Sequence, residues 1–217
     1  MNLRIRSSAA FIVGLLQFGA ALAAADVPAA AAGAAPASQT QSLVLAGGCF
    51  WGVQAVFQHV KGVIQATSGY AGGNAATANY EAVSSGTSGH AESVRVVFDP
   101  SIVSLNQLLQ VFFSVAHDPT ELNRQGPDSG TQYRSAIFYS TEEQRLAAQA
   151  FIAQLQASKT YAAPIVTKVD ALRGFYSAEA YHQNYFKNHP NDRYIFINDR
   201  PKVENLKARF PQLYVDG

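Results

Sequence analysis

The 217-residue sequence predicts an α+β fold, a two-layer α/β sandwich, on three observations. Short apolar runs typical of strands are mixed with segments whose apolar residues recur at helical spacing, without a strict strand–helix–strand repeat. Hydrophobic residues make up 48% of the chain and charged residues 14%, a balance that allows a sizeable core without the composition of a membrane bundle. The length favours one compact domain.

Five segments are predicted as strands because they are short and rich in apolar or β-branched residues. Pro100 ends the second of them, since proline cannot donate to a strand ladder. The predicted strands are residues 42–46, 92–99, 134–139, 165–169 and 194–198.

Helical spacing of apolar residues follows each of the first three predicted strands. Thr141 is the expected N-cap of the third helix, with Glu143 and Gln144 in its first turn. The first predicted helix starts at Cys49. The later helical segments are residues 105–116, residues 141–158, an aromatic-rich stretch at 175–188 and an amphipathic segment at 202–210. Glycine and proline predict loops at 69–74 and 117–131.

The N-terminal part has the pattern of a secretory signal peptide. Arg4 and Arg6 precede an apolar run at 9–24, and small residues follow in the spacing of a cleavage site. The alternative is an uncleaved anchor helix, but the run is shorter than the ~20 residues that span a bilayer. We therefore expect export without a stable membrane anchor, with the mature protein in the periplasm.

These features divide the chain into three parts. Residues 1–25 are the expected signal peptide, and residues 26–41 form an expected flexible linker rich in alanine and proline. Residues 42–217 are the expected catalytic domain.

Charge and cysteine content exclude several classes of protein. A formal net charge of +1 gives no electrostatic reason to expect a nucleic-acid partner. The histidines are scattered, so no metal site is expected. Cys49 is the single cysteine, which excludes an internal disulfide and leaves either an inert buried thiol or a reactive one.

The surroundings of Cys49 favour a reactive thiol. A strand turns through two glycines into a helix at this residue, and a helix N-terminus stabilises a thiolate. We therefore expect an exposed thiol with a lowered pKa. Phe50 and Trp51, the only tryptophan, follow at once and suit a small apolar substrate group. Taken singly, each residue is equally typical of a buried core.

The contiguous motif Gly-Cys-Phe-Trp-Gly around Cys49 resembles the nucleophile motif of A-type peptide methionine sulfoxide reductases. The resemblance extends in order over about residues 43–189. The motifs that carry it are Gly47–Gly52, Gly69–Gly73, Tyr80–Glu81, Gly89–Glu92, His117–Thr120, Asn123–Gly126, Gly130–Ser135 and Tyr181–Gln183. It implies a ferredoxin-like core with a mixed sheet and extra helices.

The resemblance also implies roles for single residues. Cys49 would attack the sulfoxide sulfur, and Glu92 would be the acid that donates to the sulfoxide oxygen. Tyr80 and Tyr133 would hydrogen-bond the same oxygen. The expected substrate-binding residues are Phe50 and Trp51, which would hold the methyl group, and Asp128 at the rim of the site.

Chemistry supports the acid role of Glu92. Sulfoxide oxygen is a poor leaving group until it is protonated, so attack by a thiolate needs an acid nearby. Glu92 opens an apolar strand, where desolvation would raise its pKa and keep it neutral. Without the motif, a surface charge at a strand end would be the simpler interpretation.

The resemblance implies reduction of methionine S-sulfoxide in proteins, with the free amino acid as an open second substrate. Many family members carry resolving cysteines, but this chain has none, and Ser84 stands where some relatives have one. The sulfenic acid on Cys49 must then be reduced by an external thiol, a thioredoxin-like protein or, in vitro, dithiothreitol. No bound cofactor is expected.

Two other functions are compatible with the same residues. Cys49 and His90 could form the pair of an acyl-transfer enzyme. The domain could also be a non-catalytic module that binds methionine sulfoxide or peptides. Only a reductase releases methionine from a sulfoxide peptide in the presence of dithiothreitol.

Overall fold

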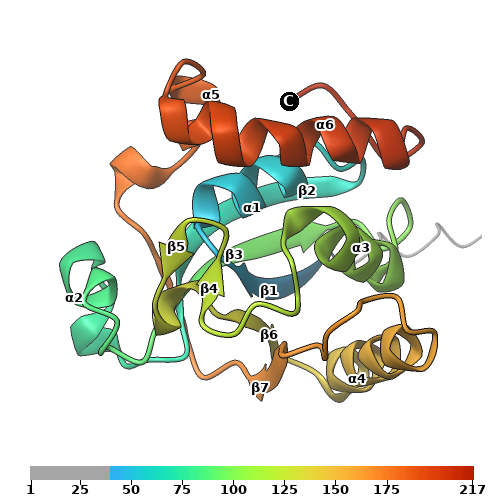
Figure 1. Cartoon of the computed structure of the whole chain (residues 1–217), viewed down its shortest axis with the longest axis horizontal. Coiled ribbons are helices and arrows are strands. Elements are labelled where there is room, and N and C mark those ends of the chain that lie inside the picture. The colour runs from blue at the N-terminus through green and yellow to red at the C-terminus, as the bar shows by residue number, and fades with distance from the viewer. Residues whose placement is uncertain (1–39) are drawn as a thin grey trace, which may run out of the picture. The chain divides into compact units, whose positions relative to one another are not determined.

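The computed structural model describes residues 40–217, so the predicted signal peptide and nearly all of the predicted linker lie outside the described residues. The domain is built on a six-stranded sheet in the order β7-β6-β1-β3-β2-β8, with a separate hairpin β4-β5 (Figure 1). The strands are β1 (Gln41–Gly47), β2 (Val63–Ala71), β3 (Ala91–Phe98), β4 (Arg124–Gln125), β5 (Asp128–Ser129), β6 (Ser135–Tyr139), β7 (Lys168–Ala171) and β8 (Phe175–Ser177).

Six α-helices and several shorter turns connect these strands in the described part of the chain. The α-helices are α1 (Phe50–Gln58), α2 (Tyr80–Ser84), α3 (Leu105–Val111), α4 (Glu142–Ala157), α5 (Tyr185–Asn188) and α6 (Arg200–Arg209). The 3₁₀ turns are η1 (Ala75–Thr77), η3 (Thr131–Tyr133) and η4 (Ala180–His182), and the π turns are η2 (Phe112–Ala116) and η5 (Ile195–Asp199). Among residues 40–217 no helix is both long and apolar enough to cross a membrane.

The four central strands have the ferredoxin-like arrangement. They lie in the order β6-β1-β3-β2 with antiparallel neighbours, while α1 connects β1 to β2 and α3 follows β3 on the way to β6. Strand β7 pairs in parallel with β6 after the crossover through α4, which makes the sheet mixed. The predicted α+β class and its ferredoxin-like core are confirmed.

The main core lies between the sheet and the helices. Alternate side chains of β1 point to opposite faces. Leu43 and Leu45 join the cluster that also contains buried side chains of α1, α3, α4 and α6. Val44 and Ala46 join a smaller cluster on the other face with Phe138. All four β1 residues are at most 1% exposed, so β1 holds the residues after it firmly in place.

Most predicted elements before residue 160 are confirmed. The strands predicted at 42–46, 92–99 and 134–139 correspond to β1, β3 and β6 within one residue. The Thr141 side chain accepts a 3.2 Å hydrogen bond from the Gln144 N–H and caps α4 as expected. The helix predicted at 105–116 is α3, whose last turn widens into η2.

The loop predicted at 69–74 is wrong in its first half. Residues 69–71 belong to β2, which begins at Val63 and was not predicted because residues 65–69, Gln-Ala-Thr-Ser-Gly, are small or polar. Gly69 is needed for close strand packing. A Cβ at this position would lie 2.4 Å from the Phe175 ring and from the Tyr176 carbonyl oxygen in the neighbouring β8.

The helix predicted at 175–188 is also wrong. The segment forms β8, the short turn η4 and one helical turn, α5. Asn184 has a left-handed backbone with φ 57°, which interrupts any continuous helix. The aromatic side chains of this segment pack around Trp51 instead of forming one helix face, as described below.

Two C-terminal strand predictions need correction. Residues 194–198 are helical and lead directly into α6, because Asp192 Oδ1 accepts the Tyr194 N–H at 2.7 Å and starts the helix. The strand predicted at 165–169 begins only at Lys168, since the Val166 N–H donates to the Pro119 carbonyl oxygen at 2.8 Å and not to a strand. Of the segment predicted as amphipathic at 202–210, residues 202–209 lie in α6 and Phe210 is its C-cap.

Candidate active site

Cys49 lies where β1 passes through Gly47 and Gly48 into α1. It occupies the N-cap position of α1, so the strand-to-helix turn predicted at this residue is confirmed. The sheet fixes the approach to this turn on both sides, since Gly47 pairs with Ser135 in β6 and Leu45 pairs with Val94 in β3. The position of the thiol is therefore set by the centre of the sheet.

The expectation of an exposed thiol with a lowered pKa is wrong for this structure. Cys49 is only 8% exposed, and its pKa is raised well above the ordinary value. Burial is the largest cause, followed by the nearby charges of Glu92 and Asp199. A hydrogen bond from the Trp51 backbone N–H lowers the pKa, as expected at a helix N-terminus, but does not outweigh burial.

All seven residues predicted for the site line one cavity of about 190 Å³. They come from five separate stretches of sequence, and Figure 1 shows the β4–β5 hairpin and α1 that supply several of them side by side. The lining residues are Cys49, Phe50, Trp51, Tyr80, Glu92, Asp128 and Tyr133, together with Tyr194, which the sequence did not suggest.

Glu92 is a buried carboxyl in the lining of this cavity. It is 3% exposed, and the Phe50 backbone N–H donates a 3.0 Å hydrogen bond to its Oε2. Burial is the largest cause that raises the pKa of Glu92, to about 8, while the Phe50 hydrogen bond lowers it. The direction expected from the sequence is found. At neutral pH the side chain is a carboxylic acid, which can accept through one oxygen and donate from the other.

Tyr80 and Tyr133 belong to short helical elements at the mouth. Tyr80 is the first residue of α2 and 37% exposed. Its backbone N–H donates to Glu179 Oε1 at 2.9 Å, while the Tyr70 hydroxyl donates to Glu179 Oε2 at 2.7 Å. Glu179 thus connects α2 to the central sheet. Burial raises the pKa of both Tyr80 and Tyr133, so their hydroxyls remain hydrogen-bond donors.

Trp51 is fixed from three sides by the C-terminal segment. Its Nε1–H donates to His182 Nδ1 at 3.1 Å. Its ring stacks on Tyr185 with the centroids 3.7 Å apart and meets the edge of Tyr194 at 5.9 Å. Phe50 packs against His182 at 5.0 Å. These contacts make a rigid apolar wall beside the thiol.

This geometry places a buried thiol, a neutral acid, two phenols and an apolar wall around a small cavity. Comparison with known proteins shows the family of the chain that carries this cavity. Residues 41–213 match the family model described as peptide methionine sulfoxide reductase. The chain belongs to the peptide methionine sulfoxide reductase family. It is of the A type and reduces methionine sulfoxide in proteins.

Sequence relatives support the A type. The chain is 58% identical over 181 residues to peptide methionine sulfoxide reductase MsrA 2 of Mesorhizobium japonicum, a match that covers 83% of this chain and 92% of the relative. It is 47% identical to the MsrA of Deinococcus radiodurans, over 82% of this chain and 86% of the relative.

Solved structures agree in fold. The reduced form of Mxr1 from Saccharomyces cerevisiae is 31% identical with a TM-score of 0.64, over 70% of this chain and 87% of that structure. Methionine sulfoxide reductase A of Corynebacterium diphtheriae is 32% identical with a TM-score of 0.62, over 71% of this chain and 77% of that structure.

Several residues of this sulfoxide reductase site were not predicted from the sequence. The Tyr194 hydroxyl donates to Asp128 and joins the hairpin to the C-terminal segment. Tyr194 lies in the segment that was predicted as a strand, and no motif assigned it to the site. His182 belonged to a recognised motif without a role, and Glu179 just before it carried no signal at all.

His90 is placed for structure and not for catalysis. Its Nε2–H donates to the Asn74 carbonyl oxygen at 2.9 Å, and its Nδ1 accepts the Gly73 N–H at 3.3 Å. Both ring nitrogens are thus engaged by one loop, which leaves no nitrogen to deprotonate Cys49. The alternative of a Cys49–His90 acyl-transfer pair has no geometric support.

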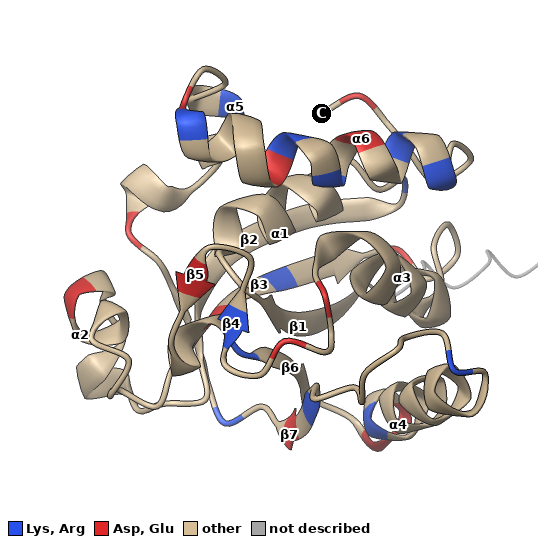
Figure 2. Ribbon diagram, viewed as in Figure 1, with Lys and Arg blue, Asp and Glu red and all other residues tan. Residues whose placement is uncertain are grey.

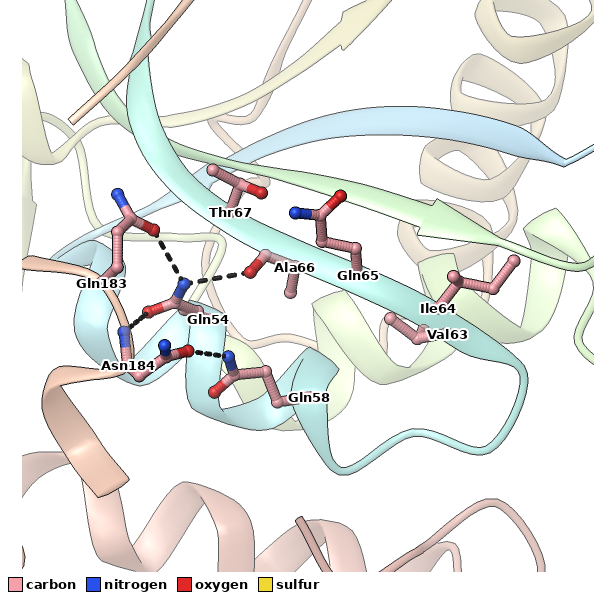
Figure 3. A pocket seen from close by; sticks show the side chains of 9 residues that line it. All are labelled: Gln54, Gln58, Val63, Ile64, Gln65, Ala66, Thr67, Gln183 and Asn184. Carbon is pink, nitrogen blue, oxygen red and sulfur yellow. Dashed lines mark hydrogen bonds between the residues drawn. The ribbon is translucent and has the colours of Figure 1, made fainter. Parts of the chain in front are cut away.

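A larger hollow of about 330 Å³ lies along α1, away from the thiol. Figure 3 shows amide side chains of α1 and of the C-terminal segment pointing toward one another beside β2. Gln54 Nε2 donates to the Ala66 carbonyl oxygen at 3.0 Å and to Gln183 Oε1 at 3.1 Å. These amides bind one another and the strand edge, and the residues that line the hollow carry no charge. Within residues 40–217 no cluster of side chains could hold a metal ion.

Proposed function

We propose that Cys49 attacks the sulfur of a methionine S-sulfoxide while Glu92 protonates the departing oxygen. The bond between the Cys49 sulfur and the substrate sulfur forms as the thiol gives up its proton, and the sulfur–oxygen bond of the substrate breaks as the protonated oxygen leaves as water. Water then bonds to the Cys49 sulfur and returns a proton to Glu92 while the sulfur–sulfur bond breaks, which gives methionine and a sulfenic acid on Cys49. The observation that supports this proposal most strongly is the neutral, buried Glu92 in the same small cavity as the only cysteine.

The other lining residues hold the substrate in this proposal. Tyr80 and Tyr133 donate hydrogen bonds to the sulfoxide oxygen, where negative charge develops as the sulfur is attacked. Phe50 and Trp51 contact the methyl group through the apolar wall. Asp128, held by Tyr194, lies at the rim, where it can bind polar groups of the substrate.

Regeneration needs an outside thiol because Cys49 is the only cysteine in the sequence. One thiol condenses with the sulfenic acid to give a mixed disulfide and water, and a second thiol releases Cys49. A thioredoxin-like protein is the proposed physiological reductant, and dithiothreitol replaces it in vitro. No bound cofactor takes part in this scheme.

The stereochemical part of the proposal is tested with peptides that contain either the S or the R epimer of methionine sulfoxide. With dithiothreitol present, we expect consumption of the S epimer only and release of methionine, measured by chromatography. Cys49→Ser should be inactive with both. Reduction of the R epimer, or binding without any methionine release, would contradict the proposal.

We also propose that the protein acts outside the cytoplasm, as a repair enzyme for oxidised exported proteins. The support is the basic and apolar pattern of residues 1–25. N-terminal sequencing of the protein from a periplasmic fraction should give a start near Ala24 or Asp26. Protein found only in the cytoplasm and starting at Met1 would contradict export.

A further inference from the structure

A buried ion pair that the proposed reaction does not use lies against the first turn of α1. Asp199 ends η5 and is fully buried, and Lys202 follows one turn later in α6 with an 18% exposed side chain. The Lys202 ammonium donates to Asp199 Oδ1 at 3.1 Å. Figure 2 shows acidic and basic positions together at the start of α6, where this helix lies over α1.

Gly52 provides the space for this ion pair. A Cβ at Gly52 would lie 2.1 Å from Asp199 Oδ1 and 2.8 Å from Lys202 Nζ, distances at which no side chain fits. Gly52 is the third residue of α1, and Cys49 is the N-cap of the same helix. Both charges therefore contact the turn of backbone that carries the nucleophile.

Asp199 is incompletely satisfied in its buried position. Its Oδ2 has no hydrogen-bond partner, and burial raises the pKa of Asp199 while Lys202 lowers it. A buried carboxylate with a free oxygen is costly unless a cation compensates it. The contact with Lys202 is the compensation that the structure provides.

The charged groups around Cys49 are mostly acidic, and one cation opposes them. Asp199 raises the pKa of the Cys49 thiol, and Lys202 lowers it. The titratable groups of the elements packed around Cys49 are Glu92 of β3, Asp128 of β5, Tyr80 of α2, His117 after η2, Tyr133 of η3, His182 of η4, Tyr185 of α5, Tyr194 and Asp199 of the η5 segment and Lys202 of α6. Burial lowers the pKa of both histidines, so Lys202 carries the positive charge of this set near neutral pH.

We propose that Asp199 and Lys202 form a charge-setting pair for Cys49, in which Asp199 holds the Lys202 ammonium against the first turn of α1 and Lys202 offsets the negative charges that oppose the thiolate. Both are positioning residues, since neither lines the substrate cavity. The inference rests on the proposed role of Cys49 as nucleophile. The C-terminal segment thus contributes to reactivity without supplying a cysteine.

The test is the pH dependence of iodoacetamide alkylation of Cys49 in the substrate-free, full-length protein. Asp199→Asn removes the negative charge and should move the alkylation inflection to lower pH. Lys202→Met removes the positive charge and should move it to higher pH. A displacement of about one unit changes the alkylation rate near neutral pH about tenfold. The double variant should lie between the two single variants.

Opposite displacements distinguish an electrostatic role from a structural one, because simple loss of packing would affect both single variants in the same direction. Lys207→Met is the matched control, since Lys207 lies in the same helix but contacts the Tyr214 ring, and it should leave the inflection unchanged. Equal inflections in Asp199→Asn, Lys202→Met and wild type, or displacements of the same sign, would overturn the proposal. Alkylation requires no sulfoxide reduction, so this result is independent of the proposed reaction.

Discussion

Cys49 has surroundings that oppose its own ionisation. Burial and nearby carboxylates raise the pKa of the thiol, and burial raises the pKa of Glu92 to about 8. Near neutral pH the resting site therefore holds a thiol and a carboxylic acid in one cavity. An acid that keeps its proton at neutral pH is what sulfoxide reduction requires of Glu92.

At this scale the catalytic role of Glu92 can be separated from its effect on the thiol. Glu92→Gln keeps the shape of the side chain but has no acidic proton, so we expect kcat/KM to fall by ~10²–10⁴. Alkylation of Cys49 should not slow, because the change removes a group that opposes the thiolate. Steady-state kinetics and alkylation are measured on the same preparation. Retained kcat/KM would rule out Glu92 as the acid.

The raised pKa of Glu92 also predicts how stability depends on pH. The folded state holds the Glu92 proton up to about pH 8, whereas the unfolded state releases it near the ordinary value of 4.5. The folded state therefore binds more protons in this window, and wild-type stability should fall as pH rises through it. Glu92→Gln has no such proton to release, so its stability does not fall in this way. The free energy of urea unfolding of the variant, relative to wild type, should therefore increase from pH 4.5 to about 8. A constant difference would contradict the raised pKa.

Single residues were predicted well where a local motif carried them and poorly where distant groups decide. The seven site residues could be named from motifs, and all of them line one cavity. The protonation of Cys49 could not be predicted, because Asp199 and the burial of the thiol come from segments far along the chain. Tyr194 was missed for the same reason.

At the scale of elements, the segment from β8 to η5 surrounds the site although it has little regular structure. It supplies Glu179 to α2, His182 and Tyr185 to Trp51, and Tyr194 to Asp128. Its contacts are made by single side chains and not by a periodic face. Helical or strand periodicity therefore could not predict it, while β1, β3, β6 and α4 follow simple patterns and were predicted correctly.

The contact between Glu179 and α2 gives a prediction for this segment. Glu179→Ala removes the acceptor of the Tyr80 N–H, which should misplace the Tyr80 hydroxyl. We expect kcat/KM to fall about fivefold to tenfold, which corresponds to about 1–1.4 kcal/mol, the usual net contribution of one hydrogen bond. In a Tyr80→Phe background the same change should cost little, because the hydroxyl is already absent. Fully additive losses in this double-mutant cycle would show that Glu179 acts elsewhere.

The pairing of β2 with β8 depends on close packing at Gly69. Gly69→Ala places a Cβ against Phe175 and the Tyr176 carbonyl, and overpacking of this kind costs about 1–3 kcal/mol. We expect a lower urea midpoint than in Gly126→Ala, where no atom lies within 4 Å of the added Cβ and the strain of φ 54° is the main cost. An equal or higher midpoint for Gly69→Ala would contradict the strand contact.

At the scale of the whole molecule, the single cysteine lies at the centre of the sheet and is surrounded by groups that lie far apart in the sequence. β1 holds the thiol, and the C-terminal segment provides the aromatic wall and the Asp199–Lys202 pair. The class of fold followed from composition and pattern, and the ferredoxin-like core from the resemblance. The wrapping of the C-terminal segment over α1 required the three-dimensional structure.

The most direct test of the account is a single turnover with excess S-sulfoxide peptide and no reductant. Because Cys49 is the only cysteine, we predict a burst of one methionine per enzyme molecule, followed by arrest. Mass spectrometry should then find one added oxygen on the protein and a dimedone adduct at Cys49, and added dithiothreitol should restart turnover. Absence of a burst, or the same burst from Cys49→Ser, would contradict Cys49 as the nucleophile. A rapidly formed disulfide-linked homodimer would contradict regeneration by an external thiol.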